Sequence, residues 1–398
     1  MSAFMRLVAV TGVSALAFAA PAAADGPGVG TPTVVTLGDS AISGEAGRWA
    51  GNTNDSSSRV DALGATAYWD TPTGEAITNC HRSKAAQAHI GGGVASANLA
   101  CSGARTSTTG TAAGEDFKPG IDFYSDAQGR RGQALALQEY AATHNVRSVV
   151  VMIGANNYGF AAIVQRCVAN FLTSPTWLKN YCSDDSDMTS RFTAARQATE
   201  TTNVKNALLA VSQAMTNAGY ASSQYTLVGQ TYWSPLPRGA GIRYSQSGFT
   251  RQSVGGCGVW NRDADWANDT VVAALANTMR NAVAQSGLPN TAVLDLQTAL
   301  DGRRLCESTV GLLEERGIAT WQSPGAVDNS EWVAQIRTLS TVFGPYQVQE
   351  SLHASYWGQL AMRNCLRQSY NVGAVRGGRC TRSANGLNAR GEPQMGLG

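Results

Sequence analysis

The sequence predicts an α/β fold built on a doubly wound, mainly parallel sheet. Its apolar segments are short and continuous rather than alternating, which is typical of strands buried on both faces. Helical segments separate them, and strands that alternate with helices form parallel sheets covered on both sides. Hydrophobic residues make up 43% of the 398-residue chain, which is enough to bury such a core.

Five segments fit this strand pattern. Each is only a few residues long, and each is followed by a turn or by a helical segment. We therefore expect a five-stranded sheet formed by residues 33–37, 97–100, 148–153, 225–229 and 292–296.

Four segments have helical character. The second has an apolar stripe of Leu208, Val211 and Met215, and Gly219 follows as a stop signal. The third begins at Asp263, a residue type favoured at helix N-termini. The expected helices are residues 134–144, 189–218, 263–286 and 357–370.

The segments between these elements are long, and long ordered loops in a compact domain are usually functional surfaces. No linker rich in Pro or Ser divides the chain, so we expect one domain over residues 25–376. Residues 377–398 contain few apolar residues and are expected to form a loosely held tail anchored by Cys380. The long loops expected are residues 43–79, 157–187, 233–262 and 303–329.

The first 24 residues have the pattern of a secretory signal peptide. Arg6 is the only charge before an apolar run over residues 7–20, and residues 21–24 supply the small side chains of a cleavage site. The run is too short to span a membrane, and no other stretch reaches 18 uninterrupted apolar residues. We expect cleavage after Ala24 and a secreted, extracellular protein that is not an integral membrane protein.

The eight cysteines then indicate disulfide bonds, because secreted proteins fold in an oxidising compartment. Their order suggests four local pairs that staple the long loops, although eight cysteines formally allow 105 connectivities. None lies in a CxxC pair, which disfavours a zinc ribbon or a thioredoxin-like site. The expected pairs are Cys80–Cys101, Cys167–Cys182, Cys257–Cys306 and Cys365–Cys380.

The charge balance limits the partners. Thirty Lys+Arg and 28 Asp+Glu give a net charge of +2, which disfavours a nucleic-acid-binding protein with a broad basic face. Any contact with a lipid surface would depend on apolar loops rather than on attraction to anionic head groups.

Polar and glycine residues follow three of the expected strands, at the edge where such sheets bind ligands. We expect a hydroxyl, a glycine amide, a carboxamide and an imidazole to converge there. The four motifs are Gly38-Asp39-Ser40, Cys101-Ser102-Gly103-Ala104, Gly154-Ala155-Asn156-Asn157 and, near the C-terminus, Glu350-Ser351-Leu352-His353.

These residue types suit acyl transfer. A serine hydroxyl becomes an effective nucleophile when an imidazole accepts its proton and a third group orients the imidazole. The developing oxyanion needs donors already in place, and the N–H groups of Ser40 and Gly103 and the Asn156 amide are candidates. The alternative is that Ser40 and Asn156 cap helices, which does not explain the glycine and the histidine.

The four motifs resemble those of the SGNH (GDSL-type) hydrolases, whose name states the Ser, Gly, Asn and His of their sequence blocks. The blocks stand in family order and span nearly all of the chain after residue 24. The resemblance implies a three-layer α/β/α, flavodoxin-like fold, with residues 25–376 as the catalytic domain and no metal or cofactor. It implies Ser40 as nucleophile, His353 as base, and an oxyanion hole of Ser40 N–H, Gly103 N–H and the Asn156 side chain.

The chain departs from the family pattern at the acid. Members usually have Asp three residues before the histidine, where this chain has Glu350. Two groups are therefore candidates to orient His353, namely the Glu350 side chain and, as in some relatives, the Ser351 main-chain carbonyl. Asn157 also replaces the usual aspartate of the third motif, and Ala41 replaces a larger residue.

The flanking segments Ser43-Gly44-Glu45 and Cys80-His81-Arg82-Ser83 are similar to those of secreted actinobacterial lipases and phospholipases. The resemblance implies a monomeric serine esterase of lipids, a lipase, phospholipase A or lysophospholipase, with a lipid interface as one place of action. The alternatives are a carbohydrate acetyl esterase and an inactive lipid- or glycan-binding relative. The aromatic residues that either line an acyl-chain groove or belong to the core are Phe160, Trp233, Tyr356 and Trp357.

The remaining histidines have simpler interpretations. His81 and His89 could share a helix face as a metal pair, but zinc sites need three or four ligands, so no metal site is expected. His144 is expected to cap a helix C-terminus. Three aspartates are expected to cap the following helix rather than bind calcium: Asp184, Asp185 and Asp187.

Overall fold

A computed structural model describes residues 25–338 and 348–398 of the chain. The expected signal peptide therefore lies outside the described residues. In the part that is described, no helix has the length and apolar character needed to cross a bilayer.

The centre of the molecule is a seven-stranded sheet with the strand order β2-β1-β3-β4-β5-β6-β7. The first five strands in this order pair in parallel, as predicted, and β6 adds a short parallel pairing to β5. The strands are β1 Pro32–Gly38, β2 Ala95–Asn98, β3 Asn145–Met152, β4 Thr226–Gln230, β5 Thr291–Asp295, β6 Gly378–Leu387 and β7 Pro393–Leu397.

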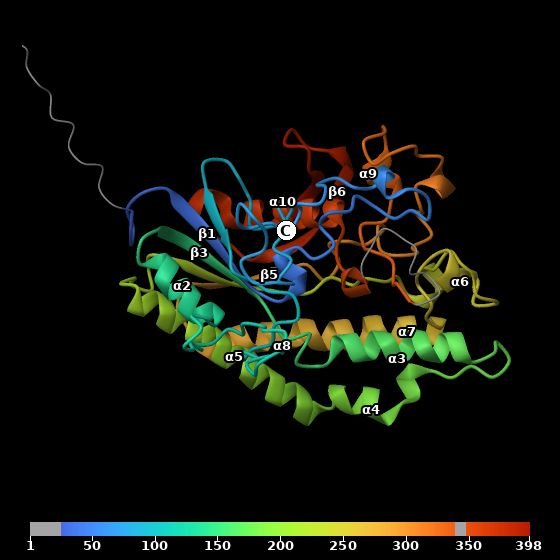
Figure 1. Ribbon diagram of the computed structural model, residues 1–398, viewed down its shortest axis with the longest axis horizontal. Helices are drawn as coiled ribbons and strands as arrows, with labels where there is room; N and C mark the ends of the chain where they lie inside the picture. Colours follow the sequence, from blue (N-terminus) through green and yellow to red (C-terminus); the bar gives the residue numbers. More distant parts are fainter. Residues whose placement is uncertain (1–24, 339–347) are drawn as a thin grey trace, which may run out of the picture.

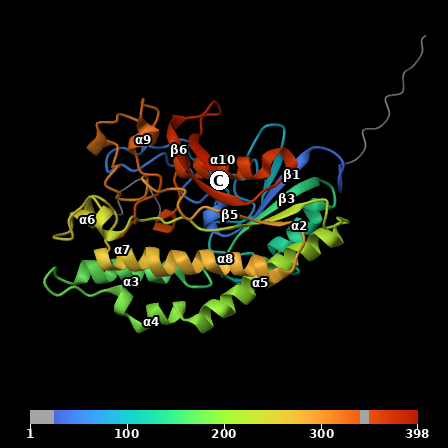
Figure 2. The same cartoon turned by 180° about the vertical axis from the view of Figure 1, so that it is seen from behind.

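Helices cover both faces, so the protein is a three-layer α/β/α structure (Figures 1 and 2). In β1, the buried Val34 belongs to one apolar core, whereas Val35 and Leu37 belong to the other, as expected when successive side chains point to opposite faces. Helices α2 Gln133–Ala141, α5 Ala194–Asn217 and α8 Ala273–Ser286 pack on the second core. Helix α10 Tyr356–Tyr370 packs on the first.

Six further α-helices complete the part of the chain that the structure describes. They are α1 Ser40–Ser43, α3 Phe160–Thr173, α4 Ser186–Thr189, α6 Thr250–Ser253, α7 Asn261–Trp266 and α9 Ala326–Asn329. The helix expected over residues 263–286 is interrupted, because a π-helical turn, Ala267–Val272, connects α7 to α8.

Two expectations about loops are wrong. Residues 157–187 contain the 14-residue helix α3, which buries Ile163, Cys167 and Phe171 at the four-residue spacing of a helix face. Residues 377–398 are not a loose tail, because they form the β6–β7 hairpin that extends the sheet. The hairpin buries Met395 at 6% exposure, and its few apolar residues are sufficient because the existing sheet edge supplies backbone hydrogen bonds.

Four disulfide bonds hold the loops, and they join the pairs expected from the order of the cysteines: Cys80–Cys101, Cys167–Cys182, Cys257–Cys306 and Cys365–Cys380. The first connects the loop before β2 to the loop after it, and the last connects α10 to β6. Disulfides at such positions fit a secreted protein.

Candidate active site

Ser40 lies in a tight turn between β1 and α1. Gly38 has φ +145°, and a Cβ atom there would lie 1.9 Å from the Met152 carbonyl oxygen, so the turn requires glycine. The Asp39 side chain accepts a hydrogen bond of 3.1 Å from the Ala41 N–H and thereby caps α1. Ser40 is the first residue of that helix and is 9% exposed.

His353 faces this serine from the turn before α10. Its Nε2 lies 2.6 Å from Ser40 Oγ, and its Nδ1 lies 3.1 Å from the carbonyl oxygen of Ser351. With Nδ1–H donated to that carbonyl, Nε2 carries the lone pair that accepts the serine proton. Burial lowers the pKa of His353, an effect that the Glu45 charge and the Ser351 and Glu350 carbonyls partly oppose, so the imidazole is neutral at neutral pH.

The Glu350 side chain and the Ser351 carbonyl are the two candidates to orient the His353 ring, and the contact within hydrogen-bond distance is the one to the Ser351 carbonyl. The Glu350 carboxylate instead accepts hydrogen bonds from Trp49 Nε1, at 2.9 Å, and from the Tyr68 hydroxyl. Its backbone carbonyl accepts the His353 N–H at 3.2 Å, so Glu350 shapes the turn, while its carboxylate is bonded to Trp49 and Tyr68.

Replacing Glu350 by glutamine is therefore expected to leave kcat for ester hydrolysis within about fivefold of the wild-type value, because the ring keeps its carbonyl partner. Stability should fall by about 1.5–3 kcal/mol, because the buried Trp49 donor and the half-buried Tyr68 donor lose an ionised acceptor. Steady-state kinetics and urea unfolding measure the two effects. A loss of more than a hundredfold in kcat in a folded variant would assign the orienting role to Glu350.

The loop after β2 presents Gly103. Its φ is +80°, a conformation that favours glycine, and the loop is fixed by the Cys80–Cys101 disulfide and by a hydrogen bond of 3.0 Å from Cys101 N–H to the Gly38 carbonyl. In the described part of the chain, the N–H groups of Ser40 and Gly103 donate to no other protein atom, so both are available to a substrate oxygen.

Asn156 follows β3 and reaches toward the same loop. Its Nδ2 donates a hydrogen bond of 2.9 Å to the Ala104 carbonyl, which fixes the amide and leaves its second hydrogen for a ligand. Neighbouring Asn157 accepts from Thr106 N–H and donates to the buried Glu200, so asparagine also forms this turn.

The sequence prediction did not include Tyr232, which follows β4 at the same edge of the sheet. Its hydroxyl donates to the Asp39 carboxylate and accepts from the Ala155 N–H at 3.2 Å. It thus joins the turn of Ser40 to the turn of Asn156. Burial raises the pKa of Asp39 to about 7, even though the Tyr232 and Ala41 hydrogen bonds oppose this rise. The sequence signal that could have identified Tyr232 is its position just after a predicted strand.

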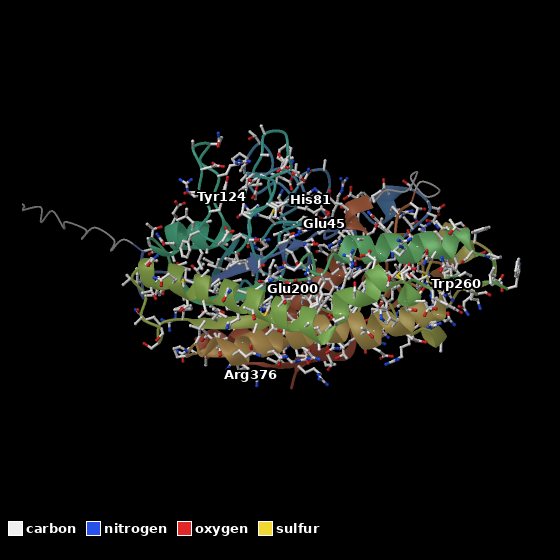
Figure 3. The ribbon with its side chains drawn as sticks, turned by 90° about the horizontal axis from the view of Figure 1, so that it is seen from below. Glu45, His81, Tyr124, Glu200, Trp260 and Arg376 are labelled. Carbon is white, nitrogen blue, oxygen red and sulfur yellow. A yellow bond between two sulfur atoms is a disulfide. The ribbon has the colours of Figure 1, made fainter. Side chains whose placement is uncertain are left out.

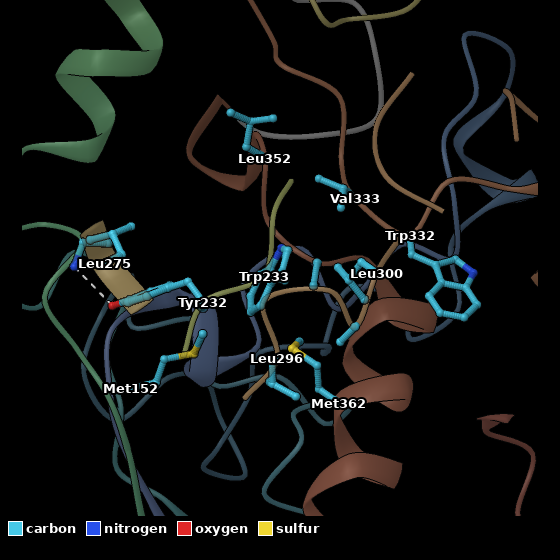
Figure 4. Close-up of a cluster of buried hydrophobic side chains, with 14 of the residues drawn as sticks. Met152, Tyr232, Trp233, Leu275, Leu296, Leu300, Trp332, Val333, Leu352 and Met362 are labelled. Carbon is cyan, nitrogen blue, oxygen red and sulfur yellow. Dashed lines mark hydrogen bonds between the residues drawn. The ribbon is translucent and has the colours of Figure 1, made fainter. Parts of the chain in front are cut away.

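An apolar pocket adjoins the serine and the histidine. A second apolar pocket continues from it between α3 and residues 259–272. The two share Phe160, Pro235, Val272 and Leu352, so they adjoin and together present an apolar surface next to the nucleophile. Figure 4 shows part of the buried cluster behind this surface, with Tyr232, Trp233, Leu275 and Leu352 labelled.

Of the other residues singled out in the sequence, two aromatic residues line the pocket and the rest lie elsewhere. His89 contacts Ser96 Oγ, and His144 stacks on Tyr140. Of the aromatic candidates, Phe160 and Trp233 line the pocket, whereas Tyr356 and Trp357 pack with Trp321. Asp184 pairs with Arg262, Asp185 is the N-cap residue of α4, and Asp187 pairs with Arg191.

No family model matches the chain, and no curated protein matches it in sequence. Similar solved structures include an extracellular lipase from Streptomyces rimosus, with 20% identity and a TM-score of 0.44, and phospholipase A1 from Streptomyces albidoflavus NA297, with 18% identity and a TM-score of 0.46. Each similarity covers 85% of this chain and 99% of the other. The lipase Lip_vut3 from a goat rumen metagenome has 11% identity and a TM-score of 0.34 over 87% of this chain and 99% of its own. These similarities concern the overall arrangement and leave the chemistry to be inferred from the site itself.

Proposed function

We propose that the protein is a secreted serine esterase of the SGNH type that hydrolyses carboxylic esters of lipids. The observation that carries this proposal is the hydrogen-bonded chain from Ser40 Oγ through His353 to the Ser351 carbonyl. It lies beside backbone and amide donors and at the start of an apolar surface. A neutral imidazole next to a hydroxyl is the arrangement that activates a serine nucleophile.

In the proposed reaction, Ser40 Oγ attacks the ester carbonyl carbon while His353 Nε2 takes the hydroxyl proton. The carbonyl oxygen becomes negative and accepts hydrogen bonds from Ser40 N–H, Gly103 N–H and Asn156 Nδ2. The C–O bond to the alcohol then breaks, and His353 returns its proton to the leaving oxygen. Water, deprotonated by the same imidazole, attacks the acyl-enzyme and releases the acid and Ser40.

The apolar surface supports lipid esters over the alternatives. An acetyl group would occupy only the part next to Ser40, whereas a longer chain continues past Phe160 and Leu352 into the second pocket. Comparing acetyl, octanoyl and palmitoyl esters of one alcohol tests this. We expect kcat/KM to rise from acetyl to octanoyl; an enzyme that hydrolyses only acetyl esters would be an acetyl esterase. If the protein hydrolyses none of these esters and a fluorophosphonate does not label Ser40, the remaining interpretation is an inactive lipid- or glycan-binding protein.

Ala267→Phe is expected to lower kcat/KM for palmitoyl esters about tenfold and to leave acetyl esters unchanged. Ala267 lines the second pocket but not the first, so the added ring fills only the distal part. Excluding two methylene groups costs about 1.6 kcal/mol, slightly more than a factor of ten in rate. The matched control is Ala273→Phe, because Ala273 lies between one and two helical turns further along and lines a different, more polar pocket. Equal losses in both variants would contradict the assignment.

A further inference from the structure

A buried histidine that the proposed reaction does not use, His81, interacts electrostatically with His353. The side chain of His81 is 7% exposed, that of Glu45 is 0% exposed, and His81 Nδ1 lies 2.6 Å from Glu45 Oε1. Figure 3 shows the two residues next to each other. Burying such a pair costs desolvation energy, and the reaction steps proposed above use neither residue. The pair therefore needs an explanation of its own.

Glu45 is attached directly to the turn of the nucleophile. Gly44 ends α1 in the left-handed conformation, and the next N–H, that of Glu45, donates a hydrogen bond of 3.2 Å to the Ser40 carbonyl. A shift of Glu45 would therefore be transmitted to the backbone of Ser40.

The same pair contacts the turn that carries His353. The Gln349 amide nitrogen donates a hydrogen bond of 3.4 Å to Glu45 Oε2. It also lies 2.9 Å from His81 Nδ1, which accepts nothing from it when it donates its own proton to Glu45. Gln349 belongs to the short 3-10 turn Val348–Glu350, which immediately precedes the His353 segment. The pair thus bridges two segments that are more than 300 residues apart in sequence.

Tyr68 makes a second connection to this turn. Its ring stacks on the His81 imidazole with centroids 4.4 Å apart, and its hydroxyl donates to the Glu350 carboxylate. Burial raises the pKa of Tyr68 well above its usual value, with the charges of Glu350 and Glu45 adding to the rise, so the hydroxyl keeps the proton that it donates.

Carboxylates surround His81 on several sides. Glu45 follows α1, Glu75 lies 4.0 Å from Nε2 in the preceding loop, and Glu350 comes from the turn of His353. Burial alone would lower the pKa of His81, but the hydrogen bond and charge of Glu45, together with Glu75 and Glu350, leave it raised. His81 is therefore an imidazolium in the acidic range where His353 changes its charge.

We propose that Glu45 and His81 are positioning residues for the proposed reaction, because they hold the turn of His353 against the turn of Ser40 and place two opposite charges near the His353 imidazole. This inference rests on the proposed function, but it concerns groups that do not touch the reacting atoms.

The two charges act on His353 with opposite signs. The negative charge of Glu45 favours the imidazolium form of His353 and so raises its pKa, whereas the positive charge of His81 lowers it. A general base is active only when neutral, so kcat/KM falls below the pKa of His353. His81→Gln should therefore move the acidic limb of the pH profile to higher pH. Glu45→Gln should move it to lower pH by a smaller amount, because the loss of Glu45 also removes the main group that raises the pKa of His81. Both changes retain a hydrogen-bonding side chain.

The test is the pH dependence of kcat/KM for a short-chain ester with the full chain. The activity of each variant is measured at a pH on the acidic limb and divided by its plateau value. We expect this ratio to be about threefold lower than the wild-type ratio for His81→Gln, and higher than the wild-type ratio by less than about threefold for Glu45→Gln. Glu45→Ala, which also removes the bridging contacts, should lower the plateau kcat about tenfold with little change in KM. Asp39 lies in the Ser40 turn, its pKa is raised to about 7, and it is present in the wild type and in all variants.

His89→Gln is the matched control. His89 is half-buried, and burial lowers its pKa to about 4, so the substitution removes no charge in the measured range and should leave the limb in place. Melting temperatures and fluorophosphonate labelling establish that each variant is folded. If Glu45→Gln does not fold, the sign of the His81→Gln shift decides alone. Shifts in the same direction, or none, overturn the inference; a wild-type chain without esterase activity overturns the proposed function instead.

Discussion

Ser40→Ala is expected to lower kcat for ester hydrolysis by roughly 10⁶-fold. The substitution removes the attacking oxygen, and it leaves His353 without the group that it contacts at 2.6 Å. A residual rate above that of the uncatalysed reaction should remain, because the donors of the oxyanion site still bind the transition state.

The fold should survive this change. Ser40 contributes its backbone to α1, and alanine is a good helix former. The side-chain cap of the helix comes from Asp39, so no cap is lost. We expect a melting temperature within a few degrees of the wild-type value, since only one buried hydrogen bond is removed.

Fluorophosphonate labelling provides the second measurement. The probe should label the wild type at Ser40 and should not label the Ser40→Ala variant. Ser102→Ala is a suitable control, because Ser102 is a buried serine in the loop of Gly103 and has no role in the proposed reaction. Full activity in Ser40→Ala would refute the mechanism, whereas equal losses in both variants would indicate a general disturbance of the site.

The alternative interpretation of the sequence is that Ser40 and Asn156 only cap helices, and the structure disagrees with it. Asp39, and not Ser40, supplies the side-chain cap of α1. The N-cap residue of α3 is Gly159, so the Asn156 side chain is not the cap of that helix either. Both side chains are therefore available for the roles proposed here.

The parallel core of the sheet could be predicted because its signal is local. A strand covered on both faces has a continuous apolar run, and β1 and β3 bury nearly every residue. The motifs then follow from topology, since carboxyl ends of parallel strands share one edge. This is why Ser40 and Asn156 could be expected near each other from sequence alone.

Other features depend on tertiary contacts that no local pattern reports. The β6–β7 hairpin has little apolar character of its own and is stabilised by pairing to β5, by the Cys365–Cys380 disulfide and by an ion pair between Arg367 and Glu392. The orientation of the Glu350 side chain also depends on tertiary contacts. Its spacing from His353 allows the carboxylate either to contact the imidazole or to point away from it. Trp49 and Tyr68, which are far away in sequence, draw the carboxylate away from the ring.

Asn156→Ala is expected to lower kcat by 10²- to 10³-fold while KM changes little. The amide is held by its bond to the Ala104 carbonyl, so it is oriented before the substrate arrives. Such a donor acts mainly when the carbonyl oxygen becomes an oxyanion, and its loss costs about 2.7–4 kcal/mol in the transition state. The ground-state ester, which carries little charge on that oxygen, loses much less.

A transition-state analogue distinguishes this role from a loss of local structure. A boronic acid that adds to Ser40 forms a tetrahedral anion, and its affinity for Asn156→Ala should fall in parallel with kcat, while the KM of the ester stays nearly constant. If Asn156 only fixed the loop through Ala104, substrate and analogue would be weakened together. An unchanged kcat in Asn156→Ala would leave the two backbone N–H groups of Ser40 and Gly103 as the whole oxyanion site.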